Sequence, residues 1–130
     1  MKVSIYEGLQ DELFCKLGKF AMDAALIKKL GNPITTDKDS VWVIISLGSR
    51  VVGFCRLKNT TNRNIISNVH LEIDNKDIFD KLLSSTFEKC KKGLVITSYA
   101  NAETLPHFER NGFRVSKQGV NWHTITKDSL

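Results

Sequence analysis

Two runs of β-forming residues in the middle of the chain constrain the fold more than any other feature. Residues 41–47 and 51–57 are rich in valine, isoleucine and other residues that favour strands. Only residues 48–50, with the sequence Gly-Ser-Arg, separate them. Because so short a connection joins antiparallel neighbours, the sequence predicts a β-hairpin at residues 41–57.

The segment before this hairpin predicts a strand followed by helix. Val3 and Ile5 alternate with polar residues, as in a short strand. Between residues 9 and 30 apolar side chains recur at steps of three and four, which predicts one amphipathic helix or two helices broken at Gly18. The glycine and proline of residues 31–33 are expected to end this helical segment.

A further strand is predicted at residues 65–73, after a polar loop. Its period-two alternation places Ile65, Ser67, Val69, Leu71 and Ile73 on one face and Ile66, Asn68, His70 and Glu72 on the other. We expect the second, more polar face to line a cleft.

The last part of the chain alternates helices with short strands. Asp74 and Asn75 offer an N-cap to a helix over residues 78–90 that ends before Gly93. A two-turn helix is expected from Thr104 to Gly112, because a proline at position 106 is tolerated only in a first turn. Strands are expected at residues 94–98, 113–117 and 120–126. The order of elements predicts one mixed α/β domain over residues 1–130.

The composition excludes several classes of protein. The 19 Lys and Arg against 14 Asp and Glu give a net charge of +5, but the basic residues are scattered, which argues against nucleic-acid binding. The longest apolar stretch is too short for a membrane span, and the first residues lack the apolar centre of a secretory signal. We therefore expect a cytoplasmic protein that does not bind membranes.

The cysteines and histidines predict no metal site. Cys15, Cys55 and Cys90 lie in apolar segments at wide spacing, so we expect three reduced thiols in the core. None of the three histidines has a cysteine within the spacing of metal ligands. The sequence leaves the oligomeric state open, because Trp42 suits either a core or a dimer contact.

The order of elements and a short C-terminal pattern resemble the GNAT superfamily of acyl-CoA N-acyltransferases. The pattern consists of an Asn after the family's fifth strand and an aromatic residue four before a Gly-Phe pair, here Asn101, Phe108, Asn111, Gly112 and Phe113. A Val-Val-Gly run at residues 51–53 is also similar to the family's third strand. The resemblance implies an α+β fold with a mostly antiparallel mixed sheet of about seven strands and helices on both faces.

The same resemblance implies an N-acyltransferase that moves an acetyl group from acetyl-CoA to an amine. The resemblance implies Glu72 as the base that deprotonates the amine. His70, on the same face of the predicted strand, and His107 are the other candidate catalytic residues. The implied cofactor contacts are Leu71, Ile73, Asn75, Lys76, Asp77, Ile78, Asn101 and Phe108. A backbone N–H near residues 71–73 is expected to polarise the thioester carbonyl.

Two departures from the family pattern support a different reading. The family holds the CoA pyrophosphate with a glycine-rich loop, but residues 72–78 contain no glycine, and Asp74, Asp77 and Asp80 place negative charge there. Phe108 stands where the family often has a tyrosine that protonates the leaving thiolate, and a phenyl ring suits core packing instead. The alternative is therefore a non-catalytic GNAT-like module that binds a protein partner.

A second resemblance points to small GNAT-like proteins of short-tailed bacteriophages. These share the altered loop, the phenylalanine and an ending similar to residues 122–127, Trp-His-Thr-Ile-Thr-Lys. This likeness implies a viral protein of the host cytoplasm or the virion, serving in virion morphogenesis or host takeover.

Overall fold

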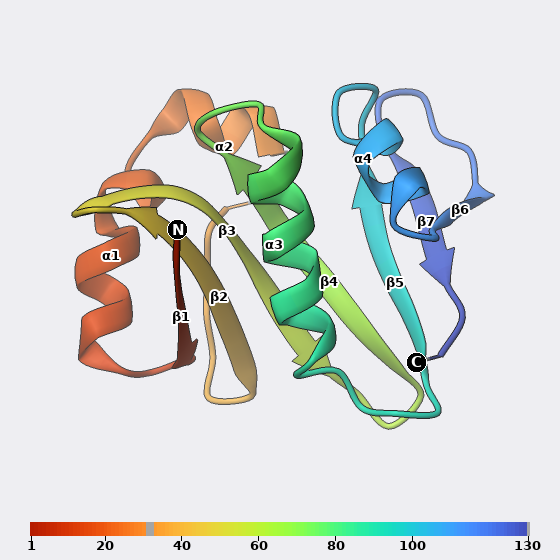
Figure 1. Cartoon of the computed structure of the whole chain (residues 1–130), viewed down its shortest axis with the longest axis horizontal. Coiled ribbons are helices and arrows are strands. Elements are labelled where there is room, and N and C mark those ends of the chain that lie inside the picture. Colours follow the sequence, from red (N-terminus) through yellow and green to blue (C-terminus); the bar gives the residue numbers. More distant parts are fainter. Residues whose placement is uncertain (31–32, 130) are drawn as a thin grey trace.

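The computed structural model describes residues 1–30 and 33–129, and its centre is one seven-stranded sheet (Figure 1). The strands, in chain order, are β1 (Lys2–Glu7), β2 (Ser40–Leu47), β3 (Arg50–Asn59), β4 (Arg63–Leu71), β5 (Val95–Ala100), β6 (Arg114–Lys117) and β7 (His123–Lys127). Their order across the sheet is β1-β2-β3-β4-β5-β7-β6, and β4 and β5 form its parallel pair. The expected mixed, mostly antiparallel sheet is confirmed.

Helices cover both faces of this sheet. The helices are α1 (Asp11–Ala21), α2 (Ala24–Leu30), α3 (Lys76–Phe87) and α4 (Leu105–Arg110). Alternate residues of β2 separate two apolar cores: Trp42 packs with α1 and α2, whereas Val43 packs with α3 and α4. Both side chains are fully buried within the chain. Figure 1 shows α3 and α4 lying over the same face of the sheet.

The helical segment before the hairpin is broken at a different residue from the one expected. Gly18 lies inside α1, and the break falls at Met22 and Asp23. The Asp23 carboxylate accepts a hydrogen bond from the Leu26 N–H (3.1 Å) and so caps the start of α2. The expected stop at Gly31 and Asn32 lies outside the described residues.

Most of the other boundaries follow the sequence closely. Asn75 caps α3, and Gly112 ends α4 with a φ of 94°. The last hairpin is shorter than expected, because β7 begins at His123 rather than at residue 120. Cys55 and Cys90 are buried, but Cys15 is exposed on α1, so the expectation of three core thiols was wrong for that residue.

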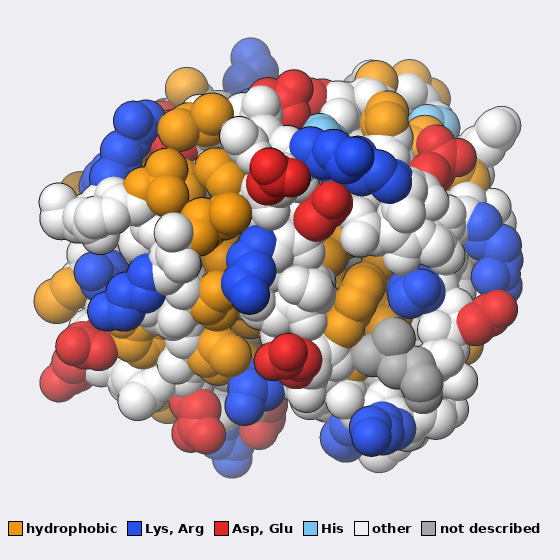
Figure 2. Space-filling model, in the orientation of Figure 1, with side chains coloured by type: hydrophobic (Ala, Val, Ile, Leu, Met, Phe, Trp, Pro, Cys, Tyr) orange, Lys and Arg blue, Asp and Glu red, His pale blue; other side chains and the backbone are white. Residues whose placement is uncertain are grey.

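Two further observations concern membrane-spanning helices and the distribution of surface charge. No helix in the described part of the chain is both long and apolar enough to cross a membrane. On the face shown in Figure 2, Lys and Arg side chains are interspersed with Asp and Glu rather than merged into one basic surface.

Asp37 fastens the segment before β2 to the neighbouring strand. Its carboxylate accepts hydrogen bonds from Lys58 (3.0 Å), Arg56 (3.0 Å) and the Ser40 hydroxyl (2.9 Å). The hydrogen bond from Lys58, aided by that from Ser40, lowers the pKa of Asp37 from 3.8 to about 2.

We expect Asp37→Asn to remove part of the acid sensitivity of folding. A lowered folded-state pKa adds stability above the unfolded value of 3.8, and this stability is lost as the pH falls toward 2. The Tm of the wild-type chain should therefore fall more steeply between pH 4 and 2 than that of the variant. Asp39→Asn, two residues away in the same segment, is the matched control. Parallel curves for all three proteins would contradict the assignment.

Candidate functional site

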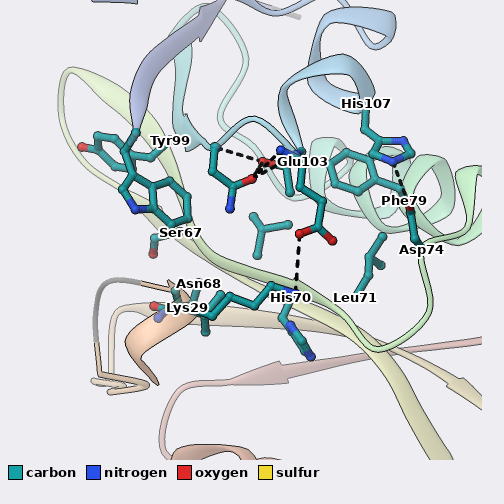
Figure 3. Close-up of a pocket in the computed structure, with 15 residues that line it drawn as sticks. Lys29, Ser67, Asn68, His70, Leu71, Asp74, Phe79, Tyr99, Glu103 and His107 are labelled. Carbon is teal, nitrogen blue, oxygen red and sulfur yellow. Dashed lines mark hydrogen bonds and ion pairs between the residues drawn. The ribbon is translucent and has the colours of Figure 1, made fainter. Parts of the chain in front are cut away.

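The strands β4 and β5 part in the middle of the sheet and leave an opening. Their parallel pairing runs only from Arg63 opposite Val95 to Ile65 opposite Thr97. Beyond this point β4 stays paired with β3, and β5 stays paired with β7. A cavity of about 50 Å³ lies at the opening, lined by residues of α2, β4, β5 and α4 (Figure 3). Of the face that was expected to line a cleft, Asn68 and His70 line this cavity, whereas Ile66 and Glu72 are not among its lining residues.

A β-bulge at Asn68 changes which side chains face this cavity. From Ser67 to His70 the chain advances three residues while β3 advances only two, from Arg56 to Phe54. Asn68 is the extra residue and has a φ of 51°, a left-handed conformation that asparagine tolerates better than most residues.

Because of this bulge, the alternation of faces that was expected along the whole strand was wrong. Ile66 was expected on the polar face with His70, but it packs in the core on the α3 side together with Val69 and Leu71. Ser67 and His70 belong to the opposite side, which α2 approaches. An uninterrupted period of two cannot describe a strand that contains one unpaired residue.

His70 and Glu72 meet at the end of β4. The His70 Nε2 lies 3.2 Å from the Glu72 Oε1. The imidazole is buried, 8% exposed, against the rings of Phe20 and Phe54, whereas the Glu72 side chain is 33% exposed. Burial lowers the pKa of His70 below 6.5, although Glu72 acts in the opposite direction. This pair therefore contains a neutral imidazole at neutral pH, held by a carboxylate.

The backbone beside this pair offers a hydrogen-bond donor to the opening. The Glu72 N–H donates to the Val52 carbonyl oxygen on β3 (2.8 Å). Because N–H groups alternate in direction along an antiparallel strand, the N–H of Leu71 is directed to the other edge of β4, which faces β5. This is the geometry of a donor for a carbonyl oxygen placed between the two strands.

Several residues that line the cavity were not selected from the sequence, and four of them are charged or aromatic residues from separate segments. These are Lys29 from α2, Tyr99 from β5, Glu103 from the segment before α4 and Trp122 from the segment before β7. In Figure 3 the Lys29 side chain reaches across the cavity toward Glu103, and the two charged groups are 3.7 Å apart. No local pattern marks these residues, since three or more segments must fold before they meet.

Comparison with solved structures identifies this architecture. Escherichia coli ElaA has a TM-score of 0.79 and 12% identity, over 98% of this chain and 100% of that one. An acyl-CoA N-acyltransferase from Pseudomonas aeruginosa has a TM-score of 0.70 and 8% identity, over 97% and 98%. The aminoglycoside 6'-N-acetyltransferase from Enterococcus faecium has a TM-score of 0.69 and 10% identity, over 100% and 98%. The chain has the GNAT fold. No protein-family model and no curated protein matches the sequence.

The place where GNAT proteins hold the CoA pyrophosphate is altered in this chain. The Asn75 side chain accepts hydrogen bonds from the N–H groups of Asp77 (2.9 Å) and Ile78 (3.1 Å), so two donors of the first turn of α3 are already bonded. The exposed carboxylates of Asp74 and Asp77 oppose an anion there, and only Lys76 offers positive charge in the first turn. A diphosphate therefore does not fit the start of α3.

His107 also lines the cavity, beside Asp74 and Phe79 (Figure 3). Its Nε2 lies 3.0 Å from the Asp74 Oδ1, and its ring stacks on Phe79 at 4.8 Å. Arg110 from the same helix donates to the His107 Nδ1 (3.2 Å) and also pairs with Asp80 on α3. Of the three expected catalytic residues, the structure brings His70 and Glu72 together and places His107 in a link between α3 and α4 (Figure 3).

Of the remaining expected cofactor contacts, Asn101, Ile78 and Phe108 have structural contacts in this chain, whereas Ile73 does not. Asn101 lines the cavity, but its Oδ1 accepts hydrogen bonds from the N–H groups of Glu103 and Thr104 before α4. Ile78 is buried in the core, and Ile73 is 37% exposed after the end of β4. Phe108 is fully buried, edge-on to Phe79 and Phe113 at 5.1 Å each.

We expect Phe108→Tyr to destabilise the chain by about 1–3 kcal/mol, because the added hydroxyl would be buried among aromatic rings. The free energy of unfolding in urea measures this loss. Phe14→Tyr, at a half-exposed position of α1, is the control and should be neutral. A Phe108→Tyr variant as stable as the control would show that the ring has access to a polar partner or to water.

Proposed function

We propose that this chain is an N-acyltransferase that transfers an acyl group from a thioester to an amine. The observation that carries the proposal is the opening between β4 and β5, with the His70–Glu72 pair at its edge. GNAT neighbours of the same fold include an acyl-CoA N-acyltransferase and an aminoglycoside N-acetyltransferase, which supports this class of reaction. Because fold alone does not fix chemistry, the roles below are derived from this chain's own groups.

Two groups of the chain suit the two charge changes of such a transfer. The reaction forms a C–N bond, breaks the C–S bond and moves one proton from the amine to the departing sulfur. The Leu71 N–H is directed to the opening and would stabilise negative charge on the acyl oxygen. The His70–Glu72 pair would accept the proton from the amine, since the imidazole is neutral and its carboxylate stabilises the protonated form.

The proposed donor contact is the thioester arm rather than the nucleotide end of CoA. Asn75 has bonded the N–H groups of Asp77 and Ile78, which leaves Lys76 as the residue of the first turn that suits a phosphate. We therefore expect acetyl-CoA and the acetyl thioester of pantetheine to bind with similar affinity, within about threefold.

Calorimetry and thermal unfolding with acetyl-CoA, CoA and acetyl-pantetheine test this function. Binding to the folded state must raise the Tm by mass action. Ser67→Phe, which fills the cavity from β4, should abolish both the heat of binding and the shift, whereas Ser116→Phe, exposed on β6, should preserve them. Absence of heat and of any Tm shift with all three compounds would overturn the proposed donor.

A second function is favoured by the same altered helix start. The capped N–H groups of α3 and the Asp74–His107 contact give α3 and α4 a fixed connection that needs no cofactor. A non-catalytic GNAT-fold module that binds a protein partner fits these contacts. This function predicts that a pull-down from the native host captures a stoichiometric protein partner whether or not CoA is present. It also predicts no heat of binding and no Tm shift with thioesters.

A further inference from the structure

A wider groove adjoins the inner cavity on the α2 side of the molecule. This outer groove has a volume of about 460 Å³ and lies between α2, the segment before α4 and the segment before β7. The two spaces share Lys29, Asn101, Glu103 and Trp122 in their walls. A molecule in the outer groove can therefore present one end to the opening between β4 and β5.

Opposite charges lie at the junction of the two spaces. The Lys29 Nζ and the Glu103 Oε2 are 3.7 Å apart, which is longer than a charge-assisted hydrogen bond of about 2.7–2.9 Å. The two side chains are 49% and 55% exposed, so the pair contributes little stability and separates at little cost. An incoming ligand with both charges can replace this weak contact with two better ones.

The distribution of charge gives such a ligand a direction. Lys29 and Glu103 line both spaces, but Lys28 lines only the outer groove, whereas the Asp74 carboxylate and His70 line only the inner cavity. An anionic group is therefore favoured on the outer side and an ammonium group on the inner side, nearer to the proposed proton acceptor. Trp122 lines both spaces and Tyr99 lines the inner one, and their rings suit an apolar or aromatic side chain.

We propose that the acceptor is a free α-amino acid with an apolar or aromatic side chain. Its ammonium and carboxylate groups sit on one carbon atom, so a single molecule engages Glu103 with the first and Lys29 with the second. Its role as an acceptor rests on the proposed function, but its binding does not. The orientation carries the ammonium group toward the opening, where the His70–Glu72 pair takes up the proton that must leave before the amine attacks. The proton that leaves after the attack goes to the departing sulfur.

Ligand-detected NMR titration of the full chain without any thioester tests the binding. The probes are L-phenylalanine, phenethylamine, which lacks the carboxylate, and 3-phenylpropionate, which lacks the amine. L-Phenylalanine should bind at least about tenfold more tightly than either partial probe. Equal binding of phenethylamine, equal binding of 3-phenylpropionate, or no binding of L-phenylalanine would each overturn the proposal.

A charge exchange separates this site from a general charge effect. Lys29→Glu and Glu103→Lys should each weaken L-phenylalanine binding about tenfold or more, while Lys38→Glu, outside both spaces, should not. The double variant Lys29→Glu/Glu103→Lys should bind L-phenylalanine again, but in the opposite orientation. Its ammonium group would then lie at position 29, away from the opening, so the double variant should not regain acyl transfer. A double variant as weak as the single ones would overturn the pairing. Amino-acid binding without transfer from any thioester would refute the proposed function and leave this site standing.

Discussion

Replacing Phe54 with alanine should lower the free energy of unfolding by about 3–5 kcal/mol. Phe54 is fully buried on β3, and its ring centroid lies 5.1 Å from Phe20, 6.1 Å from Trp42 and 5.4 Å from His70. Its removal leaves a cavity in the core beneath α1, lined by rings that cannot collapse into it. Urea unfolding followed by tryptophan fluorescence and circular dichroism measures the loss.

Phe14→Ala is the matched control for this prediction. Phe14 belongs to α1, as Phe20 does, but it is 49% exposed, so its removal should cost under about 1 kcal/mol. A Phe54→Ala variant no less stable than Phe14→Ala would show that the core beneath α1 repacks freely. Because Phe54 also contacts His70, we expect the destabilised variant to lose acyl transfer as well.

The sequence carried the order of the elements because each is marked by a local signal. The hairpin has its short turn, α3 has its asparagine cap and α4 has its glycine stop, and all three were confirmed. The helix break was misplaced because glycine was weighted above Asp23, whose cap on α2 is visible only once the side chain is seen to bond the Leu26 N–H.

The bulge in β4 shows a different limit. A left-handed residue inside a strand leaves no clear mark when that residue is asparagine, which also occurs in ordinary polar positions. The error was confined to the residues before the bulge, because His70 and Glu72 are two apart after it and so could be predicted as neighbours. Lys29 and Glu103 could not be paired in advance, since 74 positions separate them along the chain (103 − 29).

At the start of α3 the sequence and the structure give complementary information. The lack of glycine in residues 72–78 indicated from the sequence that a diphosphate would be poorly held. The structure adds the reason the helix tolerates this loss, since Asn75 satisfies the N–H groups that an anion would otherwise bind. This chain combines a capped helix start with an opening between β4 and β5, so the binding of the donor and the binding of the acceptor can be tested separately.

Replacing His70 with glutamine should lower kcat for acyl transfer by about 10²–10⁴-fold, the range for loss of a general base. In the wild-type chain the pKa of His70 is lowered by burial, so the imidazole stays neutral as the pH falls to 6.5. The acid limb of the kcat/KM profile should therefore have its midpoint below pH 6.5. A midpoint above 6.5 would contradict the assignment of the acid limb to a histidine whose pKa is lowered by burial.

The Glu72→Gln variant tests whether Glu72 positions His70 or acts as a second base itself. Glu72 raises the pKa of His70 against the effect of burial, so its neutral replacement should move the acid limb to still lower pH. It should also reduce kcat by about 10²-fold, and the double variant should be no slower than His70→Gln, because the two groups act as one unit. Asp74→Asn, whose carboxylate contacts His107 rather than His70, should leave the limb unchanged. Losses that multiply in the double variant would show that the two residues act independently, and the shared proton site would then have to be abandoned.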